Sequence, residues 1–178
     1  ELRRNACKPG DIILTTGIHG LSKLGFLIQN KINFDNEFSL NERLTIKSIE
    51  HFCRPRVYPN FLNNLLKTRS NKNIRRIGCT DSSDGLFQAL QDLAIASNCK
   101  AIINYEKIPK DKDWPKGDKW DEYYFFGGED YELVFSLPKK WAENLSKLDK
   151  NINEIGFFTD GEPSIEFKDN KKNKLFNN

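Results

Sequence analysis

Methionine is absent from all 178 residues, including position 1. The missing start residue predicts that the chain is one piece of a longer protein. No stretch approaches the roughly 18 apolar residues that a membrane-spanning helix needs, and no signal-peptide pattern opens the chain. We therefore expect a cytoplasmic protein that has no membrane partner.

Paired cysteines and an excess charge of one sign are also lacking. The four cysteines are far apart and form no Cys-x-x-Cys pair, which indicates neither a zinc site nor a redox motif but buried, reduced thiols. The 28 basic and 25 acidic residues leave a net charge of only +3, so we expect no nucleic-acid partner. The basic run at 168–174 is interpreted as a solvated edge.

Three common catalytic patterns do not occur in the sequence. There is no Gly-x-x-x-x-Gly-Lys loop, no Gly-x-Gly-x-x-Gly string and no Ser, His and Asp order typical of hydrolases. P-loop, dinucleotide-binding and nucleophilic hydrolysis functions therefore have no support. We assign no catalytic residue from the sequence.

Aromatic residues are plentiful, with 13 Phe, 5 Tyr and 3 Trp, and they favour a packed core over disorder. Hydrophobic patterning predicts strands at 12–16, 75–80, 100–105, 131–137, 152–159 and 164–167. It predicts helices at about 21–28, 41–51, 60–67, 86–98, 120–126 and 138–148. Because strands and helices alternate without a linker, we expect residues 1–178 to form a single α+β domain with helices packed on a mixed β-sheet.

Asp81 and Asp84 stand three residues apart where a predicted strand meets a predicted helix. A helix start needs only one capping side chain, so Ser83 or Asp84 as an N-cap is one interpretation. The second carboxylate favours another, because two close carboxylates repel each other unless they share a cation. Magnesium suits such a pair, since it takes oxygen ligands and usually bridges a few carboxylates to substrate phosphates. From these residues alone, both interpretations stay open.

A second string, Gly-Gly-Glu-Asp-Tyr-Glu-Leu at 127–133, leads into a predicted strand. Adjacent glycines permit positive φ angles and let a ligand approach the backbone closely. As an isolated feature the pair also fits an ordinary turn. Glu129 and Asp130 place two carboxylates directly after it.

Together, the two strings resemble the C-terminal domain of the thiamine-monophosphate kinase family, which belongs to the aminoimidazole-ribonucleotide-synthetase-like superfamily. The resemblance extends from about residue 4 to residue 158, and the string at 127–133 matches the family signature without a substitution. The family's Asp-x-Ser-Asp-Gly-Leu motif implies that Asp81 and Asp84 bind magnesium and that Ser83 contacts ATP. The resemblance further implies that Glu129 binds thiamine phosphate, while the three residues after it shape the loop.

Other positions resemble the family less closely. Arg4 lies in a segment similar to the one in which the family's arginine contacts ATP phosphates, and Arg3 is the alternative if the register shifts by one. A guanidinium suits phosphate because it offers a planar fork of donors. His51 belongs to a segment that is one residue shorter than the family's and lacks one of its prolines, which favours a structural corner. His19 receives no role.

The resemblance implies a kinase that transfers the γ-phosphoryl of ATP to thiamine phosphate, with Mg²⁺ as cofactor, and releases thiamine diphosphate and ADP. It also implies that an N-terminal domain of the same protein supplies further ATP and magnesium ligands, and that the full-length protein is a homodimer. The chain alone is then expected to be inactive. Two alternatives remain: another ATP-using member of the superfamily, such as the purine-pathway synthetase, and a non-catalytic binding module.

Overall fold

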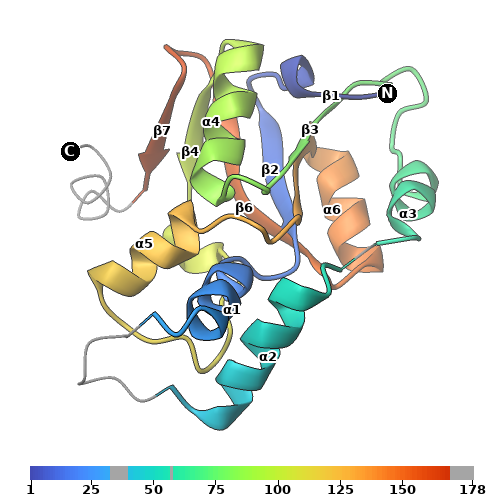
Figure 1. Cartoon of the computed structure of the whole chain (residues 1–178). Coiled ribbons are helices and arrows are strands. Elements are labelled where there is room, and N and C mark those ends of the chain that lie inside the picture. The colour runs from blue at the N-terminus through green and yellow to red at the C-terminus, as the bar shows by residue number, and fades with distance from the viewer. Residues whose placement is uncertain (33–39, 57, 169–178) are drawn as a thin grey trace.

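A seven-stranded mixed sheet is the centre of the computed structural model, which describes residues 1–32, 40–56 and 58–168 (Figure 1). The strands are β1 (Leu2–Arg3), β2 (Asp11–Thr16), β3 (Ile77–Asp81), β4 (Lys100–Ile103), β5 (Leu133–Pro138), β6 (Ile152–Thr159) and β7 (Ser164–Phe167). Their order in the sheet is β1-β3-β5-β2-β6-β4-β7. The two outer pairs, β1 with β3 and β4 with β7, are parallel, whereas the four inner pairs are antiparallel.

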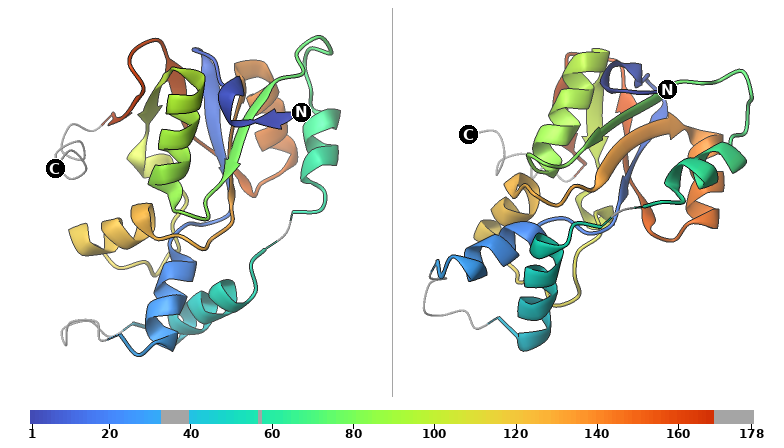
Figure 2. Two further views of the ribbon diagram at one scale, coloured as in Figure 1. Left: turned by 45° about the horizontal axis from the view of Figure 1, so that its top comes forward. Right: turned by 45° about the vertical axis from the view of Figure 1, so that its right-hand side comes forward.

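The helices surround this sheet on three sides. They are α1 (Leu21–Gln29), α2 (Glu42–Cys53), α3 (Phe61–Lys67), α4 (Leu86–Ser97), α5 (Asp118–Phe126) and α6 (Lys139–Leu148), with short 3₁₀ helices at Arg4–Ala6 and Tyr105–Lys107. Figures 1 and 2 show α4 on one face of the sheet and α3 and α6 on the other. The helices α1, α2 and α5 gather at one end, below the strands in both figures.

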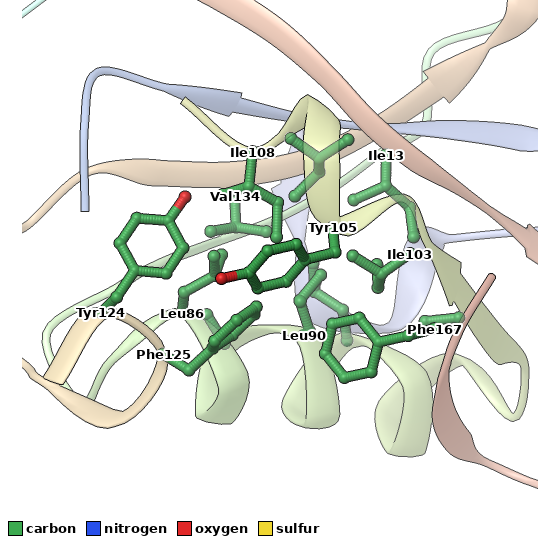
Figure 3. Close-up of a cluster of buried hydrophobic side chains, with 14 of the residues drawn as sticks. Ile13, Leu86, Leu90, Ile103, Tyr105, Ile108, Tyr124, Phe125, Val134 and Phe167 are labelled. Carbon is green, nitrogen blue, oxygen red and sulfur yellow. The ribbon is translucent and has the colours of Figure 1, made fainter. Parts of the chain in front are cut away.

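An aromatic cluster fills the space between α4 and the sheet (Figure 3). Tyr105 stacks on Phe125 with 5.8 Å between ring centroids, and Phe167 meets Phe125 edge to face at 5.3 Å. Leu86 and Leu90 project into this cluster from α4 and are fully buried. The cluster therefore joins α4, α5 and the sheet edge formed by β7.

A second cluster lies on the opposite face of the sheet. Successive residues of a strand point to opposite faces, and β2 accordingly places Ile13 in the first cluster and Leu14 in the second. Phe61 from α3 meets Phe135 edge to face at 5.1 Å, and Trp141 from α6 is also fully buried there. Because both faces of the sheet are covered, its central strands are apolar on both sides.

The predicted α+β architecture is confirmed, and each predicted strand and helix is present; β6 and β7 have the predicted ends, and the others are shifted at one or both ends. The helix expected from residue 41 begins at Glu42 because Asn41 is its N-cap, with Oδ1 accepting the N–H of Leu44 at 2.8 Å. The strand expected from residue 131 begins only at Leu133, since Tyr131 has a φ of +53° that a strand does not accommodate.

The expectation of buried, reduced thiols holds for Cys7, Cys79 and Cys99, whereas Cys53 is exposed, and all four are free. Burial raises the pKa of Cys79 to about 12, which keeps that thiol protonated. Among the described residues, no helix is long and apolar enough to cross a membrane. Most of the basic run, at 169–174, lies outside the described residues.

Candidate functional site

The two sequence strings meet at the end of the sheet that faces α1, α2 and α5. They do so because β3 and β5 are antiparallel neighbours, with Asp81 paired to Leu133. The N–H of Ser82 donates to the carbonyl of Glu132 at 2.9 Å, and Ser82 Oγ accepts the N–H of Glu132 at 3.1 Å. Strand pairing therefore continues beyond the sheet into both loops.

Gly128 allows the two loops to touch. A Cβ atom at this position would lie 2.2 Å from the carbonyl oxygen of Ser83, which is far inside van der Waals contact. The adjacent N–H of Glu129 donates to the same oxygen at 2.8 Å. A larger residue at 128 would break this contact, so the glycine is required by the close approach of one loop to the other.

Positive φ angles occur after the glycine pair rather than at it. Gly127 has a φ of −69°, whereas Glu129 and Tyr131 have φ angles of +68° and +53°. Neither glycine of the pair uses the positive φ angle that glycine permits. Left-handed residues other than glycine cost of order 1 kcal/mol each or more, and they persist where surrounding contacts hold them.

Residues of this loop point alternately outward and inward. Glu129 and Tyr131 are exposed, and the Tyr131 hydroxyl donates to Glu129 Oε2 at 2.9 Å. Asp130 is buried, and its two carboxylate oxygens accept the N–H of Gly20 at 2.6 Å and of Ser22 at 2.9 Å. Asp130 thus fastens the N-terminus of α1 to the loop that presents Glu129.

Glu132 is the second inward carboxylate. It accepts hydrogen bonds from Thr16 Oγ1 at 2.5 Å and from the Tyr58 hydroxyl at 3.1 Å, and His51 Nε2 lies 3.7 Å away. Burial acts to raise the pKa of Glu132, but these partners outweigh it and leave the pKa below its usual value. For Asp130 burial prevails over its hydrogen bonds and raises the pKa to about 6. The two carboxylates shape the loop, as the sequence suggested, and His51 is a buried structural residue.

Asp81 and Asp84 are exposed at the same end of the sheet, and Ser83 Oγ donates to Asp81 Oδ1 at 3.3 Å. The N-cap of α4 is Gly85, and no side chain caps the helix. The N-cap interpretation of Ser83 and Asp84 is therefore wrong. Both carboxylates are available to solvent or to a ligand.

The acidic side chains of the two strings share one neighbourhood. Glu129 raises the pKa of Tyr131 most strongly, through its hydrogen bond and its charge, and the charges of Asp81 and Asp84 add to the rise. Magnesium usually takes one or two carboxylates together with waters and phosphates, so Asp81 and Asp84 fit it as a partial ligand set. Within the described part of the chain, no group of three or more metal-binding side chains forms a complete site.

The side chain of Arg4, rather than that of Arg3, reaches the end of β3 near Asp81. Arg4 Nε donates to Thr80 Oγ1 at 3.1 Å, and its Nη1 lies 3.6 Å from Asp92 of α4. Arg3 is paired with Glu1 instead. The Arg4 side chain is 60% exposed, so its remaining donors are open to a ligand.

A cavity of about 540 Å³ opens beside the two loops. The loops contribute Ser83, Asp84, Gly128 and Glu129 to its lining. Its other lining residues come from the helices at this end of the sheet: Lys23 and Phe26 of α1, Phe52 of α2 and Phe126 of α5. Sequence reasoning missed all four, the three phenylalanines because such residues on helices normally indicate the core, and Lys23 because it belongs to no motif.

The family model for the C-terminal domain of AIR synthase related proteins matches residues 8–168. The chain belongs to this family. A thiamine-monophosphate kinase of Prochlorococcus marinus is 35% identical to it over 161 residues, which are 90% of this chain and 48% of that relative. The chain spans about half the length of the curated relatives that it matches.

Solved structures share the fold. The crystal structure of thiamine-monophosphate kinase from Stenotrophomonas maltophilia superposes with a TM-score of 0.72, covering 94% of this chain and 52% of that one. Its identity is 23%, so this likeness concerns the fold alone. AaThiL complexed with AMPPCP and TMP has a TM-score of 0.66 at 25% identity, covering 91% of this chain and 49% of that one.

Proposed function

We propose that the chain is the C-terminal domain of a kinase that transfers the γ-phosphoryl of ATP to thiamine phosphate, giving thiamine diphosphate and ADP in thiamine diphosphate biosynthesis. One observation carries the proposal: Ser83, Asp84 and Glu129, from strings far apart in the sequence, line a single cavity. The related kinase of Prochlorococcus marinus and the AaThiL complex with an ATP analogue and TMP support it.

In this proposal Asp81 and Asp84 hold Mg²⁺, which would neutralise phosphate charge during phosphoryl transfer. Such transfers depend on positioning and electrostatic stabilisation, and they need no covalent protein intermediate. Arg4, which bonds to Thr80 of β3, and Ser83, which follows β3, contact the phosphates of ATP. Glu129 binds thiamine phosphate, held in place by the Tyr131 hydroxyl.

The described residues contain no group of three or more metal-binding side chains, and the relatives are about twice as long as the chain. We therefore propose that an N-terminal domain of the same protein supplies the missing ligands. The full-length protein is proposed to be a homodimer in the cytoplasm, where ATP is present. The isolated chain is then inactive.

Other ATP-using members of the superfamily, such as the purine-pathway synthetase, remain the alternative. The unsubstituted string at 127–133 favours the kinase, because its Glu129 stands in the cavity rather than in a remote turn. A non-catalytic module is less well supported, since neither Ser83 nor Asp84 is used as the cap of α4.

The test is a direct assay of the full-length protein with ATP, Mg²⁺ and thiamine phosphate, in which thiamine diphosphate is quantified by chromatography. We expect product with Mg²⁺ and none with excess chelator. Glu129→Gln should raise KM for thiamine phosphate about tenfold, as expected when a charged partner is lost from a binding site. Glu122→Gln, an exposed glutamate of α5, is the matched control. Absence of product under all conditions would refute the kinase proposal.

A further inference from the structure

A second cavity, of about 480 Å³, lies at the start of β3, at the other end of this strand from Asp81. Leu2 of β1 pairs with Ile77, so the N-terminal segment runs beside the residues that lead into β3. The two ends of β3 are roughly 13 Å apart, at a rise of about 3.3 Å per residue. The cavity is therefore separate from the proposed magnesium ligands. Its lining residues are Glu1, Arg3, Asn5, Ala6, Cys7, Lys8, Arg75 and Arg76.

The positive charge of this cavity is only partly neutralised. Four lining residues are cationic and one is acidic. The acidic residue, Glu1, forms an ion pair with Arg3. Lys8 and Arg75 are exposed and, within the part of the chain that the structure describes, make no ion pair. Two positive charges therefore line the cavity without a carboxylate partner.

Arg76 is fixed in place at the wall of the cavity. Its Nη2 donates to Asp11 Oδ1 at 2.9 Å, and its Nη1 donates to Asp11 Oδ2 and to the carbonyl of Ala6, the latter at 3.0 Å. Asp11 is buried, whereas the Arg76 side chain is 28% exposed. A bidentate pair of this kind orients the guanidinium plane and leaves other N–H donors of the group unused. The cavity thus has an oriented donor group besides its two unpaired cations.

The stretch of sequence that leads to this cavity lacks acidic residues. Residues 51–80 contain no Asp or Glu, although the whole chain has a net charge of only +3. Figures 1 and 2 show the end of this stretch, between α3 and β3, beside the N-terminus. Like charges that lie close together repel each other, and a bound anion relieves that repulsion. The seven cations of the stretch are Arg54, Arg56, Lys67, Arg69, Lys72, Arg75 and Arg76.

We propose that this cavity binds the phosphate or diphosphate group of a small anionic ligand. Lys8 and Arg75 supply two charges that match a phosphate group, which carries about −1.5 to −2 at pH 7. Arg76 supplies planar donors that suit phosphate oxygens. The cavity has the volume of an ordinary small-molecule site, which leaves space for the rest of a phosphorylated compound. The inference does not depend on the kinase proposal, because no lining residue belongs to the loops that carry Asp84 and Glu129.

Calorimetric titration of the full-length protein with pyrophosphate tests the inference. Excess EDTA is present, so that no magnesium can hold the probe at Asp81 and Asp84. We expect saturable binding of one pyrophosphate per chain, and the affinity should fall as the salt concentration rises. Lys8→Gln and Arg75→Gln each remove one charge from an exposed side chain. Each should weaken binding about five- to tenfold, because a charge-assisted contact with the phosphate is lost.

Lys72→Gln is the matched control, because Lys72 is an exposed cation of the same stretch that does not line the cavity. It should change the affinity less than about twofold. An equal loss in Lys72→Gln and Arg75→Gln would overturn the inference, since it would show diffuse attraction to a basic surface. Absence of saturable binding would also overturn it. So would a loss in Arg4→Gln but not in Arg75→Gln, which would place the probe at the proposed ATP contact.

Inorganic phosphate and ribose 5-phosphate distinguish the possible sources of the bound group. Tighter binding of ribose 5-phosphate would support a site for a phosphorylated metabolite, because the cavity would then contact more than the phosphate. Equal affinities would support a site for the free anion. In both cases Arg75→Gln must weaken the binding of the probe, and an unchanged affinity in this variant would overturn the inference.

Discussion

Asp81 and Asp84 carry the sharpest prediction about single residues. In the full-length protein, Asp81→Asn and Asp84→Asn keep the size of each side chain but remove the charge proposed to hold Mg²⁺. We expect turnover to fall about tenfold or more, because metal stabilisation of phosphoryl charge contributes several kcal/mol. The melting temperature of the metal-free protein should stay the same or rise, since two close carboxylates repel each other. Turnover and thermal unfolding are measured on the same preparations.

Asp84→Ala is the control that separates metal binding from helix capping. An N-cap would make this substitution cost roughly 1 kcal/mol of stability. Gly85 occupies the cap position of α4 without any side-chain cap, so we expect a change within about 0.5 kcal/mol. Near-normal turnover in both Asn variants would contradict the metal assignment.

Site residues that belong to a short sequence motif could be predicted from the sequence. Residues that become neighbours only in the folded structure could not. Ser83 and Glu129 were found because each belongs to a recognisable motif. Phe26 and Phe126 were not, because an exposed ring and a core ring look alike in a helical pattern. The left-handed backbone at Glu129 and Tyr131 was also not predicted; these residues flank Asp130, whose contacts with α1 arise only in the fold.

At the scale of elements, hydrophobic periodicity predicted every strand and α-helix from β2 to β7, since these segments bury a repeated face, but not the 3₁₀ helix at Tyr105–Lys107. The two-residue strand β1 was not predicted, because its only support is pairing with β3, more than 70 residues away. Hydrogen bonds between side chains of different elements could likewise not be predicted from hydrophobic periodicity. The most consequential are those of the buried polar residues between β2, α1, α2 and β5.

His19, which belongs to that buried group, should make the folded state less stable at acidic pH. It follows β2, is fully buried, and has Nε2 2.7 Å from Thr15 Oγ1. Burial lowers its pKa from 6.5 to about 4, an effect that Glu132 opposes and His51 reinforces. Between these values the unfolded chain binds the proton and the folded chain does not. The contribution of His19 to the free energy of unfolding should therefore fall as pH drops through 6.5 towards 4, by on the order of 2 kcal/mol between about pH 7.5 and pH 5.

Urea unfolding of the chain at these two pH values, followed by tryptophan fluorescence, measures the change in the free energy of unfolding. His19→Gln removes the titrating ring, so the variant should lose less stability on acidification than the wild type does. The raised pKa of Asp130 has the opposite effect, because it stabilises the folded state as pH falls. Asp130 is present in both proteins, so the comparison between them isolates the contribution of His19. An equal loss in the two proteins would show that His19 does not set the pH dependence.

At the scale of the whole molecule, the sheet and the site have different requirements. The sheet is covered on both faces by its own helices, with large side chains such as Phe135 and Trp141 fully buried. These contacts lie within one chain, which favours independent folding. The site is less complete, because Asp81 and Asp84 provide only part of a magnesium ligand set, and the cavity is open beside them.

We therefore expect the 178-residue chain to fold cooperatively on its own and yet to be catalytically inactive. Thermal unfolding followed by near-ultraviolet circular dichroism should show one transition, because the buried tryptophans Trp114, Trp120 and Trp141 report on packing around the sheet and its end helices. ADP release with ATP, Mg²⁺ and thiamine phosphate should be absent for the chain and present for the full-length protein at equal concentration. Since both proteins contain Asp81, Asp84 and Glu129, a difference in turnover would locate the missing ligands outside this chain. Sustained phosphorylation by the purified chain would mean that these residues, with Arg4 and Ser83, suffice for transfer.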